Sequence, residues 1–549
     1  MVSYASGPSS EPLLGETIPD NLDRVAAAHG GELALVSRHQ GIRWTYAEFV
    51  EQVDTCARAL LALGVEPGDR VGIWAPNRAE WVVVQYATSK IGAILVNINP
   101  AYRSHELAYA LGQSGVSVLV TAEEFKGASY LDMIDSVRSG LGNLRTVVAL
   151  GQSEHDVAWQ TFLDGAGEVA MDRVRAIQAG LQFDDPINIQ YTSGTTGNPK
   201  GATLTHHNIL NNGYFVTGIQ GLGPGSKLCV PVPLYHCFGM VMGNLGMLSR
   251  GGTVVYPAEA FDPAATLAAV AEERCEALYG VPTMFIAMLD DPSAKTLDLT
   301  SLRTGIMAGS PCPVEVMKRV IAEMSMDEVT IAYGMTETSP VSFQSRTDDS
   351  IDRRVATVGT VMPHVECKVV DPETGRVLPT GTPGELCTRG YSVMRGYWDN
   401  PEATAEAIDD ARWMHTGDLA TMDDDGYVNI VGRIKDMVIR GGENIYPREI
   451  EEFLYSHPAV ADVQVIGVPD ARYGEELCAW VRLREGEQLT AEQLREYCHG
   501  RIAHYKIPRY LRITDEFPLT VTGKVQKYRM REISIGELEL ADAAGTATA

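Results

Sequence analysis

Residues 191–201 read YTSGTTGNPKG and come directly after a strand-like stretch, INIQY at 187–191. Glycines let the backbone turn tightly and bring amide N–H groups against phosphate oxygens, while hydroxyl and ammonium side chains add further donors. The spacing excludes a Walker A loop, because Gly194 is followed five positions later by Pro199, and Lys200 is followed by Gly201. The stretch predicts a phosphate-cradling loop after a strand, and the alternative reading is a flexible Ser/Thr/Gly-rich surface loop.

The residues around this loop alternate between strand and helix patterns. Apolar positions at helical spacing predict helices over 46–64 and 78–91, and short apolar runs predict strands at 70–76, 227–233, 253–257, 277–282, 304–309 and 330–334. This alternation indicates largely parallel sheets covered by helices, so we expect an α/β fold.

The pattern changes near residue 355. From there to about 431, short runs separated by Gly, Pro and Asp turns predict an antiparallel, barrel-like unit. We expect a large N-terminal domain over 1–433 that includes this unit, and a small, mobile α+β domain over 434–533. In the small domain the pattern predicts helices at 447–456 and 490–502 and strands at 462–468, 477–483 and 510–514. Residues 534–549, rich in Ala, Gly and Thr, predict a flexible tail.

Composition limits the function classes. The chain of 549 residues has a formal net charge of −26, which argues against a nucleic-acid partner, because phosphate binding there needs a basic face. Nine dispersed cysteines without a CxxC pair are typical of reduced thiols. No signal peptide and no membrane-length apolar run is visible. The sequence therefore predicts a cytoplasmic protein without a transmembrane segment, and it is compatible with a homodimer.

The loop at 191–201 resembles the signature of the adenylate-forming superfamily, which comprises acyl-CoA synthetases, peptide-synthetase adenylation domains and beetle luciferases. Further stretches resemble that family's motifs, in the same order between residues 192 and 524. They are AGSP at 308–311, YGMTET at 333–338, TGD at 416–418, GRIKD at 432–436, RGGENIYP at 440–447 and PLTVTGK at 518–524. Several other stretches, such as 277–289, look closest to the medium-chain fatty acyl-CoA synthetase branch.

The resemblance implies an ATP site. Thr336 would contact the adenylate phosphate, and Glu337 would hold Mg²⁺, a hard cation that prefers oxygen ligands. Asp418 would bond the ribose hydroxyls, with Arg433 near the ribose and phosphates, and Lys200 would assist the loop. The remaining nucleotide-binding candidates are Thr192, Ser193, Gly194, Thr195, Thr196, Gly197, Gly309, Ser310, Tyr333 and Gly334. Taken alone, Glu337 would be interpreted as a helix-capping or surface carboxylate, and TGD as an ordinary turn.

The resemblance also implies a C-terminal set of catalytic residues. Lys524 matches the family's adenylation lysine, although a lone lysine near a C-terminus is normally a solvated surface group. Gly441 and Gly442 match the loop that lines the tunnel for the pantetheine arm of coenzyme A. Lys435 falls at the family's hinge, where many relatives carry Asp.

The acyl side is assigned to residues 233–248. PLYHCFG at 233–239 resembles the stretch whose His or aromatic residue packs beside the carboxylate, so His236 is a candidate active-site residue, although a core histidine is the commoner reading. The stretch CFGMVMGNLGML that follows has no acidic residue, and an unpaired buried ammonium would be strongly penalised. We therefore expect an acid that is uncharged beyond its carboxylate.

The function implied is an ATP-dependent acid–CoA ligase that forms acyl-AMP and then acyl-CoA, on a medium-chain fatty or other hydrophobic carboxylic acid. The first alternative is an adenylate-forming enzyme that loads a carrier protein or serves a partner enzyme. A second alternative is a nucleotide-binding regulatory or scaffold protein, which the intact Glu337, Asp418 and Lys524 argue against. A luciferase-like oxidation is also formally open, but no residue requires it.

Overall fold

The computed structural model describes residues 1–153, 155–192, 199–310, 312–440, 443–470, 472–519 and 525–540. The chain forms two compact units, and each is described by itself. One comprises residues 5–367 and 388–414, and the other comprises residues 1–4, 368–387 and 415–549. We call them the large unit and the small unit.

The large unit contains an eight-stranded sheet that ends in the loop-bearing hairpin. Its order is β10 (Val157–Ala158), β9 (Thr146–Ala149), β6 (Val118–Thr121), β4 (Arg70–Trp74), β5 (Ile94–Asn97), β11 (Pro186–Thr192), β12 (Lys200–Thr205) and β22 (Gly396–Tyr397). The strands from β10 to β11 run parallel, and β12 and β22 then pair antiparallel. β22 comes from a segment almost 200 residues further along the chain than β12, which no local pattern could predict.

A nine-stranded sheet forms the second layer of the large unit. Its order is β19 (Thr360–Val361), β18 (Val341–Gln344), β17 (Glu328–Gly334), β16 (Thr304–Ala308), β15 (Ala277–Gly280), β13 (Lys227–Cys229), β14 (Thr253–Tyr256), β2 (Leu33–Ser37) and β3 (Ile42–Thr45). The central strands from β17 to β2 are parallel, and the edges are antiparallel. The prediction of largely parallel sheets is therefore confirmed.

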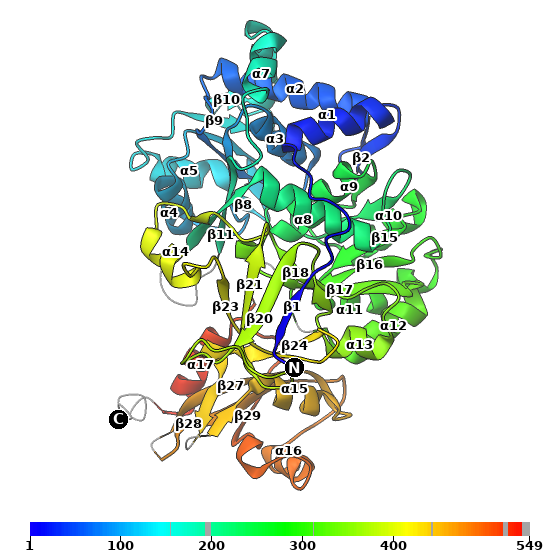
Figure 1. Ribbon diagram of the computed structural model, residues 1–549, viewed down its shortest axis with the longest axis vertical. Coiled ribbons are helices and arrows are strands. Elements are labelled where there is room, and N and C mark those ends of the chain that lie inside the picture. Colours follow the sequence, from blue (N-terminus) through cyan, green and yellow to red (C-terminus); the bar gives the residue numbers. More distant parts are fainter. Residues whose placement is uncertain are drawn as a thin grey trace. The chain divides into compact units, whose positions relative to one another are not determined.

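Helices cover both sheets, as Figure 1 shows. Helix α8 (His206–Ile219) packs against β12 of one sheet and β18 of the other, and it begins at a capping box formed by Thr205 and Asn208. The other helices of this unit are α1 (Ile18–His29), α2 (Tyr46–Ala62), α3 (Ala79–Lys90), α4 (Ser104–Ser114), α5 (Tyr130–Arg138), α6 (Trp159–Asp164), α7 (Met171–Gln178), α9 (Gly246–Ser249), α10 (Pro263–Glu273), α11 (Pro282–Asp290), α12 (Val314–Met324), α13 (Ile351–Ala356) and α14 (Pro401–Ala407). Two more strands, β7 (Glu124–Phe125) and β8 (Ala128–Ser129), form a small hairpin.

A five-stranded sheet matches the predicted antiparallel region. Its order is β1 (Tyr4–Ser6), β20 (Val365–Val370), β21 (Gly384–Gly390), β23 (Met414–Met422) and β24 (Val428–Arg433). β23 and β24 pair antiparallel with Asp418 opposite Arg433. This register places two predicted nucleotide-binding residues side by side on neighbouring strands.

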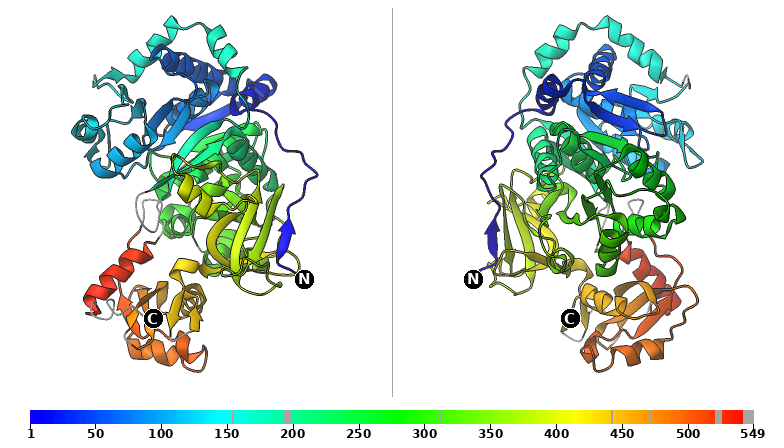
Figure 2. Two further views of the ribbon diagram at one scale, coloured as in Figure 1. Left: turned by 60° about the vertical axis from the view of Figure 1, so that its left-hand side comes forward. Right: turned by 90° about the vertical axis from the view of Figure 1, so that its right-hand side faces the viewer.

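The C-terminal part of the small unit is an α+β layer. Its sheet has the order β26 (Glu443–Ile445), β25 (Val438–Arg440), β28 (Gly474–Leu483) and β27 (Val460–Asp470), and β29 (Tyr510–Ile513) pairs with β28. One apolar cluster contains side chains of this sheet together with Ile450 and Leu454 of α15 (Pro447–Tyr455) and Leu494 and Cys498 of α16 (Ala491–Cys498). A second contains Trp480 and Met530, the latter from α17 (Lys527–Glu537), which is the red helix beside the sheet in Figure 2.

The predicted helices and strands of this part agree with the structure except at the C-terminal ends of α16 and α17. The helix expected over 490–502 stops at Cys498, and Gly500 just beyond it adopts a left-handed φ of +74° that does not continue a helix. α17 continues to Glu537, past the predicted start of the tail at 534, because Ser534 is buried and accepts a 2.9 Å hydrogen bond from Trp480 Nε1. No helix among the described residues combines the length and apolar character that a membrane span requires.

Candidate functional site

The hairpin of β11 and β12 holds the two ends of the signature loop together. Thr192 and Lys200 are paired opposite each other, and the Thr192 hydroxyl donates to the Lys200 carbonyl at 3.3 Å. Ser193, Gly194, Thr195, Thr196 and Gly197 lie outside the described residues. The loop therefore starts and ends at one point on the edge of the parallel part of the eight-stranded sheet.

A buried carboxylate lies close to the end of this loop. Glu337 sits in a short 3₁₀ turn, Thr336–Thr338, after β17, and it is only 5% exposed. The Tyr397 hydroxyl donates to Glu337 Oε1 at 2.8 Å, and Lys200 Nζ lies 5.1 Å from the centre of the Tyr397 ring. Tyr397, which the sequence did not single out, therefore contacts both Lys200 and Glu337. Burial and the Glu337 carboxylate raise the pKa of Tyr397, so its hydroxyl stays a donor at neutral pH.

The backbone around Glu337 is fixed on both sides. The Met394 N–H donates to the Glu337 carbonyl at 2.8 Å, and the buried Thr338 hydroxyl donates to the carbonyls of Met335 and Pro340 at 3.0 and 2.9 Å. Gly334 cannot carry a side chain, because an added Cβ would lie 1.7 Å from the Pro340 carbonyl oxygen. The turn thus holds Thr336 and Glu337 in a preformed geometry, which favours a binding role.

Tyr333 lies near the end of β17, and the Gly309–Ser310 pair directly follows β16, the neighbouring parallel strand. Tyr333 packs its ring 6.0 Å from that of Phe343. Gly309 has a φ of +95°, a region that L side chains rarely adopt, and both it and Ser310 are exposed. Ends of neighbouring parallel strands are a common place for ligand sites in α/β folds, so their predicted nucleotide contacts fit this location and stay a prediction.

The predicted acyl stretch contacts the Glu337 turn. Cys237 is fully buried, its thiol donates to Gln190 Oε1 at 3.0 Å, and it interacts with Thr336 and Glu337. Burial, reinforced by the Glu337 charge, raises the pKa of the Cys237 thiol, which therefore stays protonated. His236 is half-buried beside it and accepts the Phe238 N–H on Nδ1 at 3.2 Å, so the neutral ring carries its proton on Nε2.

The segment that follows His236 is apolar. Residues Phe238–Leu245 form a π-helix in which every residue is buried, and the Phe238 ring lies 5.6 Å from that of Tyr279. π-helical segments occur preferentially at functional sites. The segment that directly follows His236 is thus apolar and buried, and it offers no charged group to an acid held beside His236.

In the small unit, the TGD motif forms a tight turn on β23. Asp418 is 6% exposed and receives a 2.9 Å ion pair from Arg433 Nε, whose side chain is half-exposed. The Thr416 hydroxyl donates to the Leu386 carbonyl at 2.7 Å and accepts the Asp418 N–H at 3.1 Å. Gly417 between them has a φ of +69°. The turn thus presents a pre-oriented carboxylate, as bidentate binding of a ribose would need.

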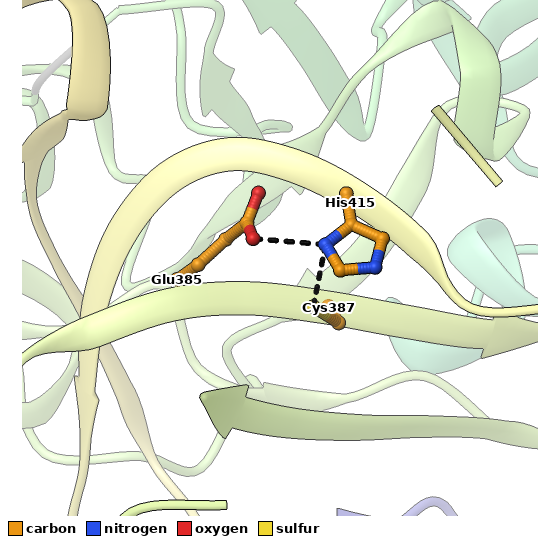
Figure 3. Close-up of side chains that lie close together, drawn as sticks. All are labelled: Glu385, Cys387 and His415. Carbon is orange, nitrogen blue, oxygen red and sulfur yellow. Dashed lines mark hydrogen bonds and ion pairs between the residues drawn. The ribbon is translucent and has the colours of Figure 1, made fainter. Parts of the chain in front are cut away.

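A charged pair supports this turn from β21. Glu385 accepts the Gly417 N–H on Oε1 at 3.2 Å and contacts His415 Nδ1 through Oε2 at 2.8 Å (Figure 3). Hydrogen bonds with Cys387 and with Glu385 raise the pKa of His415 to about 10, so the ring is charged at neutral pH and donates to the carboxylate. No local pattern in the sequence indicates this support, because Glu385 and His415 are 30 residues apart.

The predicted C-terminal residues fall only partly within the described chain. Lys435 is exposed in the short 3₁₀ segment Ile434–Asp436 between β24 and β25, a position suited to a hinge. Gly441, Gly442 and Lys524 lie outside the described residues. Three residues beyond Lys524, Lys527 Nζ bonds the buried Glu451 at 2.6 Å and the Val465 carbonyl at 3.1 Å, which fixes the start of α17.

Comparison with known proteins identifies the family. The model of the AMP-binding enzyme family matches residues 22–398, and that of the AMP-binding enzyme C-terminal domain matches residues 449–524. The chain belongs to the AMP-binding enzyme family.

Individual relatives match over nearly their whole length. YngI of Bacillus subtilis, an acyl-CoA synthetase by name, is 47% identical over 545 residues, or 95% of this chain and 98% of YngI. The mitochondrial medium-chain acyl-CoA ligase ACSF2 of Danio rerio is 45% identical, over 98% of this chain and 91% of that protein. The ATP-bound crystal structure of MatB from Rhodopseudomonas palustris is similar with a TM-score of 0.83 and 31% identity, over 94% of this chain and 99% of MatB.

Proposed function

We propose that this chain is an ATP-dependent acid–CoA ligase that converts a hydrophobic carboxylic acid to acyl-AMP and then to acyl-CoA. The observation that carries the proposal is the arrangement around Tyr397, which holds the end of the signature loop at Lys200 beside the buried Glu337. The near full-length similarity to proteins named as acyl-CoA synthetases and ligases supports the same conclusion.

In the first half-reaction, the carboxylate of the acid attacks the α-phosphate of ATP, and pyrophosphate leaves. The Lys200 ammonium and the backbone of its loop hold the β- and γ-phosphates, and Thr336 donates to the α-phosphate. Asp418 and Arg433 orient the ribose. Lys524 places its ammonium on the charge that develops at the reacting phosphate, where a preorganised donor contributes most.

Glu337 fits a Mg²⁺ ligand. Its carboxylate is buried, accepts a hydrogen bond from the neutral Tyr397 and makes no ion pair within the part of the chain that the structure describes. A buried anion of this kind is stabilised by a bound cation, and Mg²⁺ prefers oxygen ligands. When bound, Mg²⁺ would neutralise charge on the phosphate oxygens.

In the second half-reaction, the thiolate of CoA attacks the acyl carbonyl and AMP leaves. We propose that the segment after Lys435 turns between the two steps, withdrawing Lys524 and presenting the Gly441–Gly442 loop to the pantetheine arm. Two glycines suit this role because a thin thiol arm must pass close to the backbone. The use of two residue sets in succession explains how one acyl-adenylate serves two different reactions.

The apolar segment that follows His236 supports a hydrophobic acid as the substrate. The buried π-helix over Phe238–Leu245 has no acidic side chain to bind an ammonium, so an amino acid is disfavoured. A medium-chain fatty acid or another hydrophobic acid matches this surface, and ACSF2 is named as a medium-chain ligase.

The decisive experiment measures AMP release with free CoA across straight-chain, aromatic and polycyclic acids. We expect turnover that depends on ATP, acid and CoA together. Lys524→Ala is expected to lose acid-dependent ATP–pyrophosphate exchange by about 100-fold or more while still converting supplied acyl-adenylate to the thioester. Equal loss of both steps would refute the division of labour between Lys524 and the Gly441–Gly442 loop.

The competing function is transfer of the acyl group to a carrier protein. It predicts normal ATP–pyrophosphate exchange but no thioester with free CoA, and acyl transfer only when a phosphopantetheinyl carrier is supplied. No exchange with any acid would instead favour a regulatory nucleotide-binding role.

We also propose a cytoplasmic location, supported by nine cysteines that are all free. The mitochondrial location in the name of ACSF2 is the alternative, and cell fractionation separates the two. The homodimer stays a prediction, which light scattering of the purified protein would test.

A further inference from the structure

Three side chains of the small unit that take no direct part in the proposed reaction converge on one point. Glu385 and Cys387 are two positions apart on β21, so their side chains leave the strand on the same face, and His415 reaches them from β23 (Figure 3). Each offers one ligand atom, a carboxylate oxygen, a sulfur or Nδ1, and these atoms all lie within 4.8 Å of one another.

Of two distances between these atoms, one matches an edge of a small metal-coordination tetrahedron and the other is shorter. Cys387 Sγ lies 3.6 Å from His415 Nδ1, and Glu385 Oε2 lies 2.8 Å from the same nitrogen. Typical zinc bonds to sulfur and nitrogen in a tetrahedral site place those two ligand atoms about 3.5 Å apart, and nitrogen and oxygen about 3.4 Å apart. The sulfur–nitrogen edge is therefore already in place, and the oxygen–nitrogen edge needs to open by about 0.6 Å as a cation replaces the shared proton.

The surroundings suit a partly enclosed site. Cys387 is fully buried, whereas the His415 side chain is 33% exposed and that of Glu385 is 12% exposed, so a cation can approach past the imidazole. One thiolate and one carboxylate balance a charge of +2, and binding would release two protons to solvent, one from the Cys387 thiol and one from His415 Nδ1. Lys368 lies near enough to interact electrostatically with Cys387, and its positive charge weakly opposes the binding of a cation there.

We propose that Glu385, Cys387 and His415 form a binding site for a zinc-class divalent cation. Sulfur and imidazole ligands favour zinc and cobalt over magnesium, which prefers oxygen ligands alone. This site is thereby chemically distinct from Glu337, which we propose as a magnesium ligand. The proposal does not depend on the acid–CoA ligase activity, because cation binding can be measured without ATP, acid or CoA.

The test titrates the full-length, metal-free protein with Co²⁺, whose bond to a thiolate gives a charge-transfer band in the near ultraviolet. We expect one equivalent to bind with this band, Zn²⁺ to displace it and Mg²⁺ to leave it unchanged. Cys387→Ser should abolish the band, and His415→Ala should weaken Co²⁺ binding by at least about tenfold, because it removes one of three protein ligands.

Cys312 supplies the matched control. It is the one cysteine of the nine that is not buried, and therefore the thiol most open to adventitious metal. Cys312→Ser should keep both the band and the affinity. The proposal is overturned if the band follows Cys312, if it survives Cys387→Ser, or if His415→Ala binds Co²⁺ as tightly as the unmodified chain.

If Cys387→Ser fails to fold, the proposal can still be tested with His415→Ala. His415→Ala changes a side chain that is one-third exposed, and its unfolding temperature can be compared with and without Zn²⁺. The unmodified chain should gain stability with Zn²⁺, and the His415→Ala chain should lose most of that gain. Equal gains in both chains would contradict a site that includes His415.

Discussion

Tyr397→Phe tests whether the hydroxyl contact to Glu337 matters for adenylation. The substitution removes one oxygen atom and keeps the aromatic ring, whose centre lies 5.1 Å from Lys200 Nζ. What is lost is the 2.8 Å hydrogen bond from the Tyr397 hydroxyl to a carboxylate that is only 5% exposed. The perturbation is therefore confined to the position and solvation of Glu337.

The expected effect follows from the kind of bond removed. A hydrogen bond to a charged, buried group contributes about 1.5–3 kcal/mol, which corresponds to about a 10- to 150-fold change in a rate or binding constant. If Glu337 holds Mg²⁺ on ATP, the loss should appear in ATP–pyrophosphate exchange. Part of it should be recovered at high Mg²⁺ concentration, because a misplaced ligand binds the cation more weakly.

The assay compares the exchange rate of Tyr397→Phe with that of Tyr391→Phe over a range of Mg²⁺ concentrations. Tyr391 lies on the same segment, and its hydroxyl accepts from the Asn212 side chain at 3.5 Å rather than contacting Glu337. We expect the control to stay within about twofold of the unmodified chain, as weak polar contacts contribute little. Unchanged exchange in Tyr397→Phe, or equal losses in both variants, would refute the reasoning.

Three further predictions concern single contacts. Gly417→Ala places a side chain at a φ of +69°, which costs about 1–2 kcal/mol, so the KM for ATP should rise about 5- to 30-fold with little change in the KM for the acid. Gly426→Ala at a φ of +83° is the matched control, and an equal rise in its KM for ATP would contradict the role of the turn. Lys527→Met leaves the buried Glu451 without its 2.6 Å partner and should lower the free energy of unfolding by about 3 kcal/mol, as measured by urea denaturation. Adding Glu451→Gln should restore part of that loss, and a double variant that is less stable than the single one would argue against the pairing. Burial lowers the pKa of His206 to about 4, below the 6.5 expected in the unfolded chain, so the unfolded state binds more protons between these values. Stability should therefore fall by about 3 kcal/mol as the pH drops from 7 to 4, and His206→Gln should flatten that slope in urea titrations at both pH values.

The fold was predictable to the extent that its elements have local signals. Buried parallel strands carry continuous apolar runs, and helices carry an apolar periodicity, so the elements at 70–91 and the strands at 227–334 could be predicted from the residues. Strand order is not readable in this way. β22 at 396–397 joins β12 at 200–205, and β2 at 33–37 joins β14 at 253–256, through pairings that depend on distant parts of the chain.

The site residues that belong to a sequence motif could be predicted. The residues that support them from distant parts of the chain could not. Glu337, Asp418 and Arg433 were readable because fixed neighbours in the sequence identify them. Tyr397 and Glu385 were not, because each acts on its partner from 60 or 32 residues away along the chain. The short RGYW stretch at 395–398 offered one signal, since a lone tyrosine after a glycine in a strand suggests a close approach of two chain segments.

The carboxylates of Glu337, which is buried, and Glu385, which is partly buried, show how the surroundings of a residue decide its role. Glu337 accepts from a neutral hydroxyl and from no described cation, so most of its charge remains available to a metal ion. Glu385 contacts a charged imidazole and a backbone N–H, so its charge is already balanced while it holds the Gly417 turn in place. A cation at Glu385 must therefore displace the proton that His415 Nδ1 shares with Glu385. The bond to the sulfur of Cys387 supplies the additional affinity that this displacement requires. By this reasoning the two sites differ in ligand chemistry as well as in position, and a hard cation that binds Glu337 does not compete for the site at Glu385, Cys387 and His415.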